Sequence, residues 1–386
     1  MATGNLIIVQ GGGPTPVFNA SLAAIIREAQ NSPQINKIYG ARWGMKGLSA
    51  NNIVDLTALT PTNLVGLRNS PGAALGSSRY KPTSDDMQHC VENMRQLNVN
   101  YVIFMGGNGS MRGAELTRSF CRDNNYDVQI MGVPKTIDND IFATDRCPGF
   151  GSAARWATQA TRDLGMDVRS LHQPVSILET MGRNVGWIAG ATALAKQGPD
   201  DAPHLVYVPE VAFETPRFLA DVDALVTRNG WCVVVVSEGI RKADGSLVYE
   251  SGDPSLADPL SRPMVGGVST YLASVVAKEL KLRCRDEKPG LIGRSSIAMV
   301  SAQDRADAEL VGREGVRALL AGETDKMVAL RPLSEGPNAV ELVSLHSAAQ
   351  GERTIPAAFL SGGPLAVNEA FGAYVGPLMG ELISYP

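Results

Sequence analysis

The sequence predicts an α/β protein built from two doubly wound, mostly parallel-sheet domains. Short apolar runs, rich in valine and isoleucine, alternate along the chain with longer stretches of helical composition. Most of these runs are followed directly by glycine, proline or serine, which is typical of strands that end in tight loops. With 386 residues, of which 44% are hydrophobic, the chain is long enough to form two separate cores.

Five apolar runs are the expected strands, and three segments between them have the composition of helices. The expected strands cover residues 6–9, 101–105, 129–133, 175–179 and 232–236. The expected helices cover residues 19–30, 111–122 and 187–196. Segment 244–263, with its Gly, Pro and Asp residues, is expected to be a loop. Ligands of such sheets bind beyond the carboxyl ends of the strands, so we expect the functional residues in the loops that follow them.

Composition argues for a small-molecule partner in the cytoplasm. A net charge of −4 disfavours binding to nucleic acid or to an anionic membrane, which would require a basic face. The first six residues lack a basic residue, and the apolar run that follows is interrupted by glycines, so we expect neither a signal peptide nor a membrane span. The cysteines form no CxxC pair and are expected to be reduced and mostly buried: Cys90, Cys121, Cys147, Cys232 and Cys284.

Two glycine-rich loops each follow an expected strand and precede a helical segment. The first is Gly11-Gly12-Gly13-Pro14, and the second is Gly106-Gly107-Asn108-Gly109-Ser110. Backbone N–H groups in such loops can bind a phosphate at the start of a helix. A tight turn that only needs glycine explains either loop alone, but the pair favours phosphate binding. Neither loop has the spacing of a Walker A motif or of a dinucleotide fingerprint.

The heptad at residues 134–140, PKTIDND, places two carboxylates, a hydroxyl and an ammonium at the end of one strand. Phosphoryl transfer to an alcohol needs a proton acceptor and positive charge near the phosphoryl oxygens. Asp138 can be the base and Thr136 can orient the phosphoryl group. Lys135 or a bound Mg²⁺ can neutralise charge. An Asx-turn that only stabilises its own backbone is the alternative.

Several cations and one further carboxylate also stand at strand ends or turns. Arg183, in Met181-Gly182-Arg183, follows a strand, and arginine suits bidentate contact with phosphate. Glu238 follows four valines and could accept hydrogen bonds from sugar hydroxyls. Arg285 and Arg294 flank a Pro-Gly turn and could hold a substrate phosphate. Taken singly, each of these residues could equally be an ordinary surface charge.

In chain order these motifs resemble the phosphofructokinase family. The likeness runs from about residue 5 to residue 300, and PKTIDND followed by MGR is its most specific part. The motifs that carry it are Gly12-Gly13-Pro14, Gly76-Ser77-Ser78-Arg79, GGNGS at 106–110, PKTIDND at 134–140, MGR at 181–183, Glu238 and Arg294. The resemblance implies two similar α/β domains with the active-site cleft between them. Residues 1–145 plus 300–386 would bind the phosphoryl donor, and residues 146–299 would bind the sugar.

The resemblance also assigns roles to individual residues. The implied catalytic residues are Asp138 as the base, with Thr136, Arg183 and Lys135. The implied donor-binding residues are Gly12, Gly13, Arg79, Tyr80, Gly107, Asn108, Gly109 and Ser110. The implied acceptor-binding residues are Thr136, Asp138, Asp140, Met181, Gly182, Arg183, Glu238, Arg285, Leu291 and Arg294. Family members commonly assemble as homodimers or homotetramers.

The expected donor combines features of two branches of the family. The GGGPTPVFN opening and Lys135 resemble the pyrophosphate-using branch, which usually has aspartate at the position of Gly109. Glycine leaves space for a nucleotide α-phosphate and adds no repelling charge, so we expect ATP in preference to pyrophosphate. Asn108 stands where many relatives have a metal-linked aspartate. Its amide can bind Mg²⁺ through a neutral oxygen or through water, and we expect Mg²⁺ dependence.

The expected acceptor is fructose 6-phosphate, phosphorylated on its 1-hydroxyl, with a different sugar, sugar phosphate or polyol as the alternative. The family usually has a basic residue and a His or Tyr near the remote phosphate, where this chain has Pro174 and Leu291. Losing two charge-assisted bonds of about 1.5–3 kcal/mol each would weaken phosphate binding. A non-catalytic regulatory homologue and an NAD-kinase-like enzyme are further alternatives. Intact Thr136, Asp138 and Arg183 disfavour the former, and PKTIDND with MGR disfavours the latter.

Overall fold

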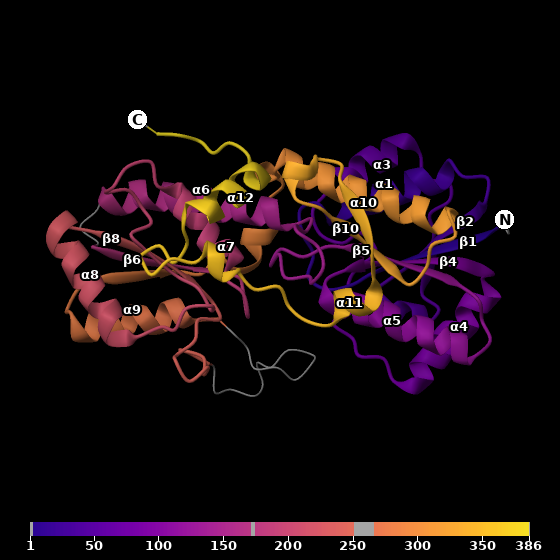
Figure 1. Cartoon of the computed structure of the whole chain (residues 1–386), viewed down its shortest axis with the longest axis horizontal. Helices are drawn as coiled ribbons and strands as arrows, with labels where there is room; N and C mark the ends of the chain where they lie inside the picture. Colours follow the sequence, from indigo (N-terminus) through magenta and orange to yellow (C-terminus); the bar gives the residue numbers. More distant parts are fainter. Residues whose placement is uncertain (1–2, 171–173, 251–265, 386) are drawn as a thin grey trace. The chain divides into compact units, whose positions relative to one another are not determined.

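The structure, a computed structural model, describes residues 3–170, 174–250 and 266–385. The chain forms two compact units (Figure 1). Unit 1 is Met1–Phe150 with Asp304–Arg353, and unit 2 is Gly151–Gln303 with Thr354–Pro386. The sequence placed all of residues 300–386 in the first domain, whereas residues 354–386 belong to unit 2. The chain therefore passes from one unit to the other at three points.

Unit 1 contains a sheet of seven strands among the residues that the structure describes, in the order β11-β10-β5-β4-β1-β2-β3. Its strands are β1 (Gly4–Gln10), β2 (Ile35–Ala41), β3 (Ile53–Asp55), β4 (Val99–Gly106), β5 (Gln129–Pro134), β10 (Lys326–Leu330) and β11 (Val340–Ser344). The five inner strands pair in parallel, and the edge strands β3 and β11 are antiparallel to their neighbours. The mostly parallel sheet predicted from the sequence is confirmed.

Helices cover both faces of this sheet. They are α1 (Phe18–Gln30), α2 (Met45–Ser49), α3 (Pro61–Arg68), α4 (Ser84–Gln96), α5 (Asn108–Asp123), α10 (Ala302–Leu320) and α11 (Leu345–Ala349). Helices α1, α3 and α10 lie on one face of the sheet, and α4, α5 and α11 lie on the other (Figure 1). A 3₁₀ turn (Leu333–Glu335) precedes β11.

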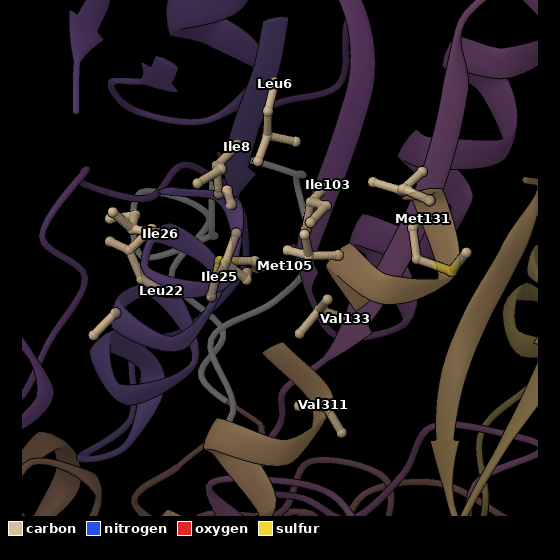
Figure 2. Packing of buried hydrophobic residues seen from close by; sticks show 14 of the residues in the cluster. Leu6, Ile8, Leu22, Ile25, Ile26, Ile103, Met105, Met131, Val133 and Val311 are labelled. Carbon is tan, nitrogen blue, oxygen red and sulfur yellow. The ribbon is translucent and has the colours of Figure 1, made fainter. Parts of the chain in front are cut away.

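The alternation of side chains along β1 explains how one strand supplies two cores. Leu6 and Ile8 pack with Leu22 of α1 and Val311 of α10 on one face, as Figure 2 shows. The intervening residues of β1 pack with Met111 of α5 on the opposite face. Because both faces of β1 are buried, its central residues 6–9 are all apolar, which is the pattern recognised in the sequence.

Unit 2 contains a smaller sheet, in which all pairings of the described strands are parallel, in the order β7-β8-β6-β9. Its strands are β6 (Val175–Thr180), β7 (Leu205–Tyr207), β8 (Cys232–Ser237) and β9 (Cys284–Glu287). Its helices are α6 (Phe150–Arg169), α7 (Trp187–Ala191), α8 (Thr215–Asn229), α9 (Val268–Glu279) and α12 (Glu369–Met379). The 3₁₀ turns are Thr192–Ala195, Gly290–Arg294, Ile297–Met299 and Ala357–Phe359.

Aromatic packing explains why residues 354–386 join unit 2. Phe371 of α12 stacks on Trp187 of α7, with ring centroids 5.8 Å apart, and Tyr374 contacts the same indole at 5.5 Å. Trp187 is fully buried by these contacts. Large aromatic side chains contribute much of the apolar burial in a core, so this cluster fixes α12 to unit 2. No motif in the sequence indicated this packing.

All five predicted strands are confirmed as β1, β4, β5, β6 and β8. The predicted helices at 19–30 and 111–122 are confirmed within α1 and α5, whereas 187–196 divides into α7 and a 3₁₀ turn. Of the predicted loop 244–263, residues 244–250 contain no helix or strand, and residues 251–263 lie outside the described residues. All five cysteines are free, and all but Cys284 are buried. Among the described helices, none combines the length and apolarity needed to cross a membrane.

Candidate active site

The two glycine loops of unit 1 lie against each other because they follow the adjacent strands β1 and β4. A Cβ atom added to Gly106 would lie 2.7 Å from the carbonyl oxygen of Gly11 and would collide with the hydroxyl of Ser110. A Cβ atom added to Gly11 would collide with the same hydroxyl. Gly106 is therefore required by the close approach of backbone to backbone, Gly11 leaves room for the Ser110 hydroxyl, and the two loops lie in contact.

Helix α5 starts within the second loop, with Gly107 as its N-cap and Asn108 as its first residue. No acidic side chain occupies the first turn of this helix, so its N-terminus retains the partial positive charge that favours an anion. A Cβ atom at Gly109 would meet no atom within 4 Å among the described residues. The position of Gly109 is therefore open, as expected from its proposed role in leaving space for a donor.

Lys135 lies beneath the first glycine loop. Its ammonium donates hydrogen bonds to the carbonyl oxygens of Gly11 at 3.1 Å and Gly13 at 2.5 Å. The same ammonium is 4.4 Å from the ring centroid of Phe18, and Lys135 is only 2% exposed. The positive charge of Lys135 therefore lies on the carbonyl side of the first glycine loop.

The acidic loop after β5 forms a local turn that is held by the Thr136 side chain. The Thr136 hydroxyl accepts a hydrogen bond from the backbone N–H of Asp138 at 3.1 Å and donates one to the Asp140 carboxylate at 2.9 Å. The backbone N–H of Lys135 donates to the carbonyl of Gly106 at 3.0 Å. The loop is thus fixed to the second glycine loop, and the partly buried Asp138 lies at its tip.

Asn108 and Asp140 contact each other directly. The Asn108 amide nitrogen donates to the Asp140 carboxylate at 2.9 Å and to the Asp140 carbonyl oxygen at 3.2 Å. Burial is the main effect that raises the pKa of Asp140. The hydrogen bond from Thr136 opposes that rise and the charge of Glu352 adds to it.

The amide oxygen of Asn108 is buried, and it has no hydrogen-bond partner in the described part of the chain. With the Asp140 carboxylate beside it, this atom offers the oxygen ligands that Mg²⁺ prefers. The described residues contain no cluster of three or more His, Cys, Asp and Glu side chains suited to a metal. The residues present therefore fit an ion that takes most of its ligands from substrate phosphate and water, which is usual for Mg²⁺.

The other predicted donor residues lie on the segment before α4. Arg79 and Tyr80 are both exposed. The Tyr80 hydroxyl donates to the Asp86 carboxylate of α4 at 2.6 Å, so it is directed toward that helix instead of the glycine loops.

Sequence reasoning missed Trp43, which lies next to this segment. Trp43 has a positive φ of 63° and is 56% exposed, which is unusual for a large aromatic residue. Its carbonyl oxygen accepts a hydrogen bond from the Ser78 hydroxyl at 2.7 Å, and its indole lies against Gly76. The exposed indole therefore lies beside the segment that contains Arg79, a predicted donor-binding residue. A single tryptophan carries no motif, so only its position in the fold reveals it.

In unit 2 the MGR segment and Glu238 meet at the carboxyl ends of the paired strands β6 and β8. The backbone N–H of Gly182 donates to the Glu238 carboxylate at 3.3 Å, and the Ser237 hydroxyl donates to the Gly182 carbonyl at 2.6 Å. A Cβ atom at Gly239 would collide with the carbonyl of Arg183. Burial is the main effect that raises the pKa of Glu238, and the bond from Gly182 opposes it.

Glu210, which the sequence analysis did not identify, binds backbone N–H groups close to the MGR segment. Its carboxylate accepts hydrogen bonds from the backbone N–H of Gly186 at 3.0 and 3.1 Å and from that of Ile355 at 3.0 Å. Burial raises the pKa of Glu210, and these bonds oppose the rise. A lone glutamate after a short strand has no sequence signature, so only the backbone contacts identify it.

The remaining predicted acceptor residues follow or belong to β9. Leu291 and Arg294 lie on a 3₁₀ turn, where Leu291 is 63% exposed. Arg285 pairs with Ser176 in the parallel register, five residues before Met181. Five residues span about 16 Å along a strand, so the Arg285 backbone lies well away from Met181 of its own unit. Unit 2 thus brings together Met181, Gly182, Arg183 and Glu238 but not Arg285.

Comparisons with known proteins agree with this geometry. The family model described as phosphofructokinase matches residues 5–319. A pyrophosphate–fructose 6-phosphate 1-phosphotransferase of Xanthomonas campestris is 36% identical, with 98% of this chain and 92% of that protein covered. A sulfofructose kinase of Alkalicoccus urumqiensis is 32% identical, with 84% and 82% covered. The crystal structure of a pyrophosphate-dependent phosphofructokinase from Marinobacter aquaeolei matches with a TM-score of 0.88 at 30% identity, with 99% and 93% covered.

Proposed function

Because the chain belongs to the phosphofructokinase family and is therefore a kinase that acts on an alcohol group, we propose that it phosphorylates the 1-hydroxyl of fructose 6-phosphate. The proposed donor is ATP, with pyrophosphate as the alternative, and the reaction depends on Mg²⁺. The observation that carries the proposal is the meeting of the two glycine loops and the acidic loop at the carboxyl ends of β1, β4 and β5. Parallel sheets bind ligands at such ends.

In this proposal Asp138 accepts the proton of the sugar hydroxyl as the hydroxyl oxygen attacks the terminal phosphorus of the donor. The bond between that phosphorus and the bridging oxygen breaks, which releases ADP from ATP or phosphate from pyrophosphate. The Thr136 hydroxyl, held by the N–H of Asp138 and by Asp140, orients the transferred phosphoryl group. Arg183 and the buried Lys135 supply positive charge. Mg²⁺, held by the Asn108 amide oxygen and the Asp140 carboxylate, would neutralise charge on the donor phosphates.

Two observations favour ATP. A side chain at position 109 would have free space around it, so a nucleotide α-phosphate has room beside α5. The exposed Trp43 lies next to Gly76–Arg79 and provides a face on which a base can stack. The names of the relatives from Xanthomonas campestris and Marinobacter aquaeolei instead favour pyrophosphate. Donor choice is therefore the first property to measure.

Acceptor binding is assigned to unit 2. Glu238 and the backbone of the MGR segment suit the hydroxyl groups of a sugar, because both lie at the same strand ends. Pro174 and Leu291 remove two partners of a remote phosphate, which favours an acceptor whose remote group carries less charge. The alternative to fructose 6-phosphate is therefore a sugar that carries a sulfonate, as the name of the related sulfofructose kinase suggests.

The assembly is proposed to be a homodimer or homotetramer in the cytoplasm. Arg285 stands about 16 Å along β9 from the level of Met181 of the same chain, and it is exposed on an edge strand. In the proposed assembly, Arg285 would contact a sugar phosphate bound to another subunit.

A matrix of initial rates tests the function directly. ATP and pyrophosphate are each combined with fructose 6-phosphate, 6-deoxy-6-sulfofructose, free fructose and a polyol, with and without Mg²⁺. The proposal expects the highest kcat/KM with ATP, fructose 6-phosphate and Mg²⁺. A preference for pyrophosphate corrects the donor, and a preference for the sulfonated sugar corrects the acceptor. Absence of turnover in every combination contradicts the proposal and favours a non-catalytic homologue.

A further inference from the structure

Side chains hold all three carbonyl oxygens of the triple-glycine turn. Lys135 donates to the carbonyls of Gly11 at 3.1 Å and Gly13 at 2.5 Å. The Ser77 hydroxyl donates to the carbonyl of Gly12 at 2.5 Å. Gly12 has a positive φ of 77°, a conformation that favours glycine. A turn that only reverses the chain has no need of a buried ammonium and a hydroxyl on consecutive carbonyl oxygens.

The held carbonyls determine where the N–H groups of the turn point. A trans peptide unit is planar, and its C=O and N–H point in opposite directions. The bond from Lys135 to the Gly11 carbonyl therefore orients the N–H of Gly12, and the bond from Ser77 to the Gly12 carbonyl orients the N–H of Gly13. Within the described part of the chain, neither of these two N–H groups has a hydrogen-bond acceptor. Successive N–H groups in a turn can form an anion-binding nest, and these two are available for one.

Phe18 supports the ammonium of Lys135. Burial of an ammonium is unfavourable unless other groups replace its water. The face of the Phe18 ring, 4.4 Å from the ammonium, supplies part of that replacement through a cation–π interaction. Phe18 is fully buried at the first position of α1, so its ring is held by the core beneath the turn.

We propose that Ser77 and Phe18 are positioning residues for the phosphoryl donor, which act by fixing the carbonyl side of the Gly11–Gly13 turn. Ser77 acts directly on the turn, and Phe18 acts through Lys135. The ligand of the turn is the diphosphate group that pyrophosphate and ATP share. The identification of this ligand as a diphosphate rests on the function proposed above. The hydrogen bonds that fix the turn do not depend on that function.

Binding of inorganic pyrophosphate, measured by isothermal titration calorimetry, tests Ser77. We expect Ser77→Ala to weaken binding roughly 5- to 20-fold, because one oriented N–H loses its support. Ser77→Thr keeps the hydroxyl and should restore binding. The matched control is Ser78→Ala, which removes a hydroxyl that donates to the Trp43 carbonyl instead of the turn. The melting temperatures of the Ser77 variants should stay close to that of the unmodified protein.

A double-mutant cycle tests Phe18. Phe18→Leu should weaken pyrophosphate binding, whereas in a Lys135→Met background the same change should have little further effect. The control for loss of a buried ring is Phe371→Leu in unit 2, which should lower the melting temperature without weakening pyrophosphate binding. Equal effects of Phe18→Leu in both backgrounds would show that Phe18 supports only the core, and would remove it from the proposal.

Kinetics separate this inference from the function on which it rests. We expect the Ser77 and Phe18 variants to raise KM for the donor with little change in kcat or in KM for the acceptor. If the unmodified protein binds pyrophosphate but transfers no phosphoryl group, the proposed function fails, and the calorimetric comparison still supports or refutes the role of the turn. Pyrophosphate affinity of Ser77→Ala within about 2-fold of that of Ser78→Ala overturns the role of Ser77. Absence of pyrophosphate and ATP binding in the unmodified protein overturns the inference as a whole.

Discussion

Asn108 donates a hydrogen bond from its side-chain amide to the Asp140 carboxylate at 2.9 Å. That bond uses the nitrogen end of the amide and leaves the oxygen end buried, without a partner among the described residues. An aspartate at position 108 would instead place two carboxylates side by side. The amide therefore permits Asp140 to remain close to the second glycine loop with or without a metal ion.

Asn108→Asp should make the stability of unit 1 depend on Mg²⁺. Two adjacent carboxylates repel each other, which costs about 1–2 kcal/mol in the absence of a cation. We expect a lower melting temperature than that of the unmodified protein in metal-free buffer, and a larger rise on adding Mg²⁺. The control is Asn93→Asp, since the buried Asn93 donates to the carbonyls of Leu48 and Ser49 and lies outside the predicted metal site. Equal Mg²⁺ responses in the two variants would argue against a metal at position 108.

Asp138→Asn should abolish most of the turnover while leaving the donor bound. Removal of a general base lowers kcat roughly 10²- to 10⁴-fold. The amide preserves the shape of the loop, because Thr136 holds the backbone N–H of residue 138 and not its side chain. Steady-state kinetics with Asp127→Asn, a change at a fully exposed side chain, provide the control. If kcat stays within about 10-fold of normal, another group is the base.

Gly109→Asp should shift the donor preference from ATP toward pyrophosphate. The new side chain enters open space in the first turn of α5, where a carboxylate is tolerated by the helix dipole, so the fold is preserved. Its charge repels the α-phosphate of a nucleotide, and we expect KM for ATP to rise by at least about 10-fold. Gly109→Asn separates the effect of charge from that of size. Equal increases in KM for both donors would contradict the assignment of the α-phosphate to this position.

Glu238 should make acceptor binding sensitive to pH. Its buried carboxyl has a raised pKa, so it becomes protonated at a higher pH than an ordinary glutamate. A protonated carboxyl accepts fewer hydrogen bonds from sugar hydroxyls, and KM for the acceptor should therefore increase as the pH falls. Glu238→Gln should weaken acceptor binding roughly 10-fold and remove this pH dependence. A pH profile unchanged by the substitution would place the titrating group elsewhere.

His204 should destabilise the protein as the pH falls. Burial is the main effect that lowers the pKa of His204 from 6.5 to about 4. The unfolded chain therefore takes up a proton first, and stability is lost progressively between about pH 6.5 and pH 4. His204→Asn can still accept from the backbone N–H of Val233 and should reduce that loss by about 1–3 kcal/mol. Urea unfolding curves at several pH values measure this loss of stability. If the stability of His204→Asn falls with pH as steeply as that of the unmodified protein, the prediction is wrong.

The strand ends and the acidic loop could be predicted because their signals are local. Apolar runs that stop at glycine or proline fixed the places of β1, β4 and β5, and the spacing of Thr136, Asp138 and Asp140 defined the loop. Close approach of the two glycine loops followed once the strands were known to be neighbours. Such features depend on residues close in sequence, or on the general rule that parallel strands end at one edge.

Other parts of the site depend on contacts between distant segments, which one sequence does not reveal. The hydrogen bond of Ser77 to Gly12, and that of Glu210 to Gly186, join residues without a shared motif. The register of β9 places Arg285 away from the MGR segment, although both were predicted to bind the acceptor. Charge and residue type indicated which residues could bind a phosphate, but only strand pairing showed where each one lies.

The three passages of the chain between the units have a consequence for synthesis on the ribosome. Unit 1 lacks β10 and β11 until residue 344 has emerged, and unit 2 lacks α12 until residue 379 has emerged. Neither unit can therefore close its core while the chain is still short. Domains made of one continuous segment can fold in order during translation, whereas each unit here needs segments that lie far apart in the sequence before its core is complete.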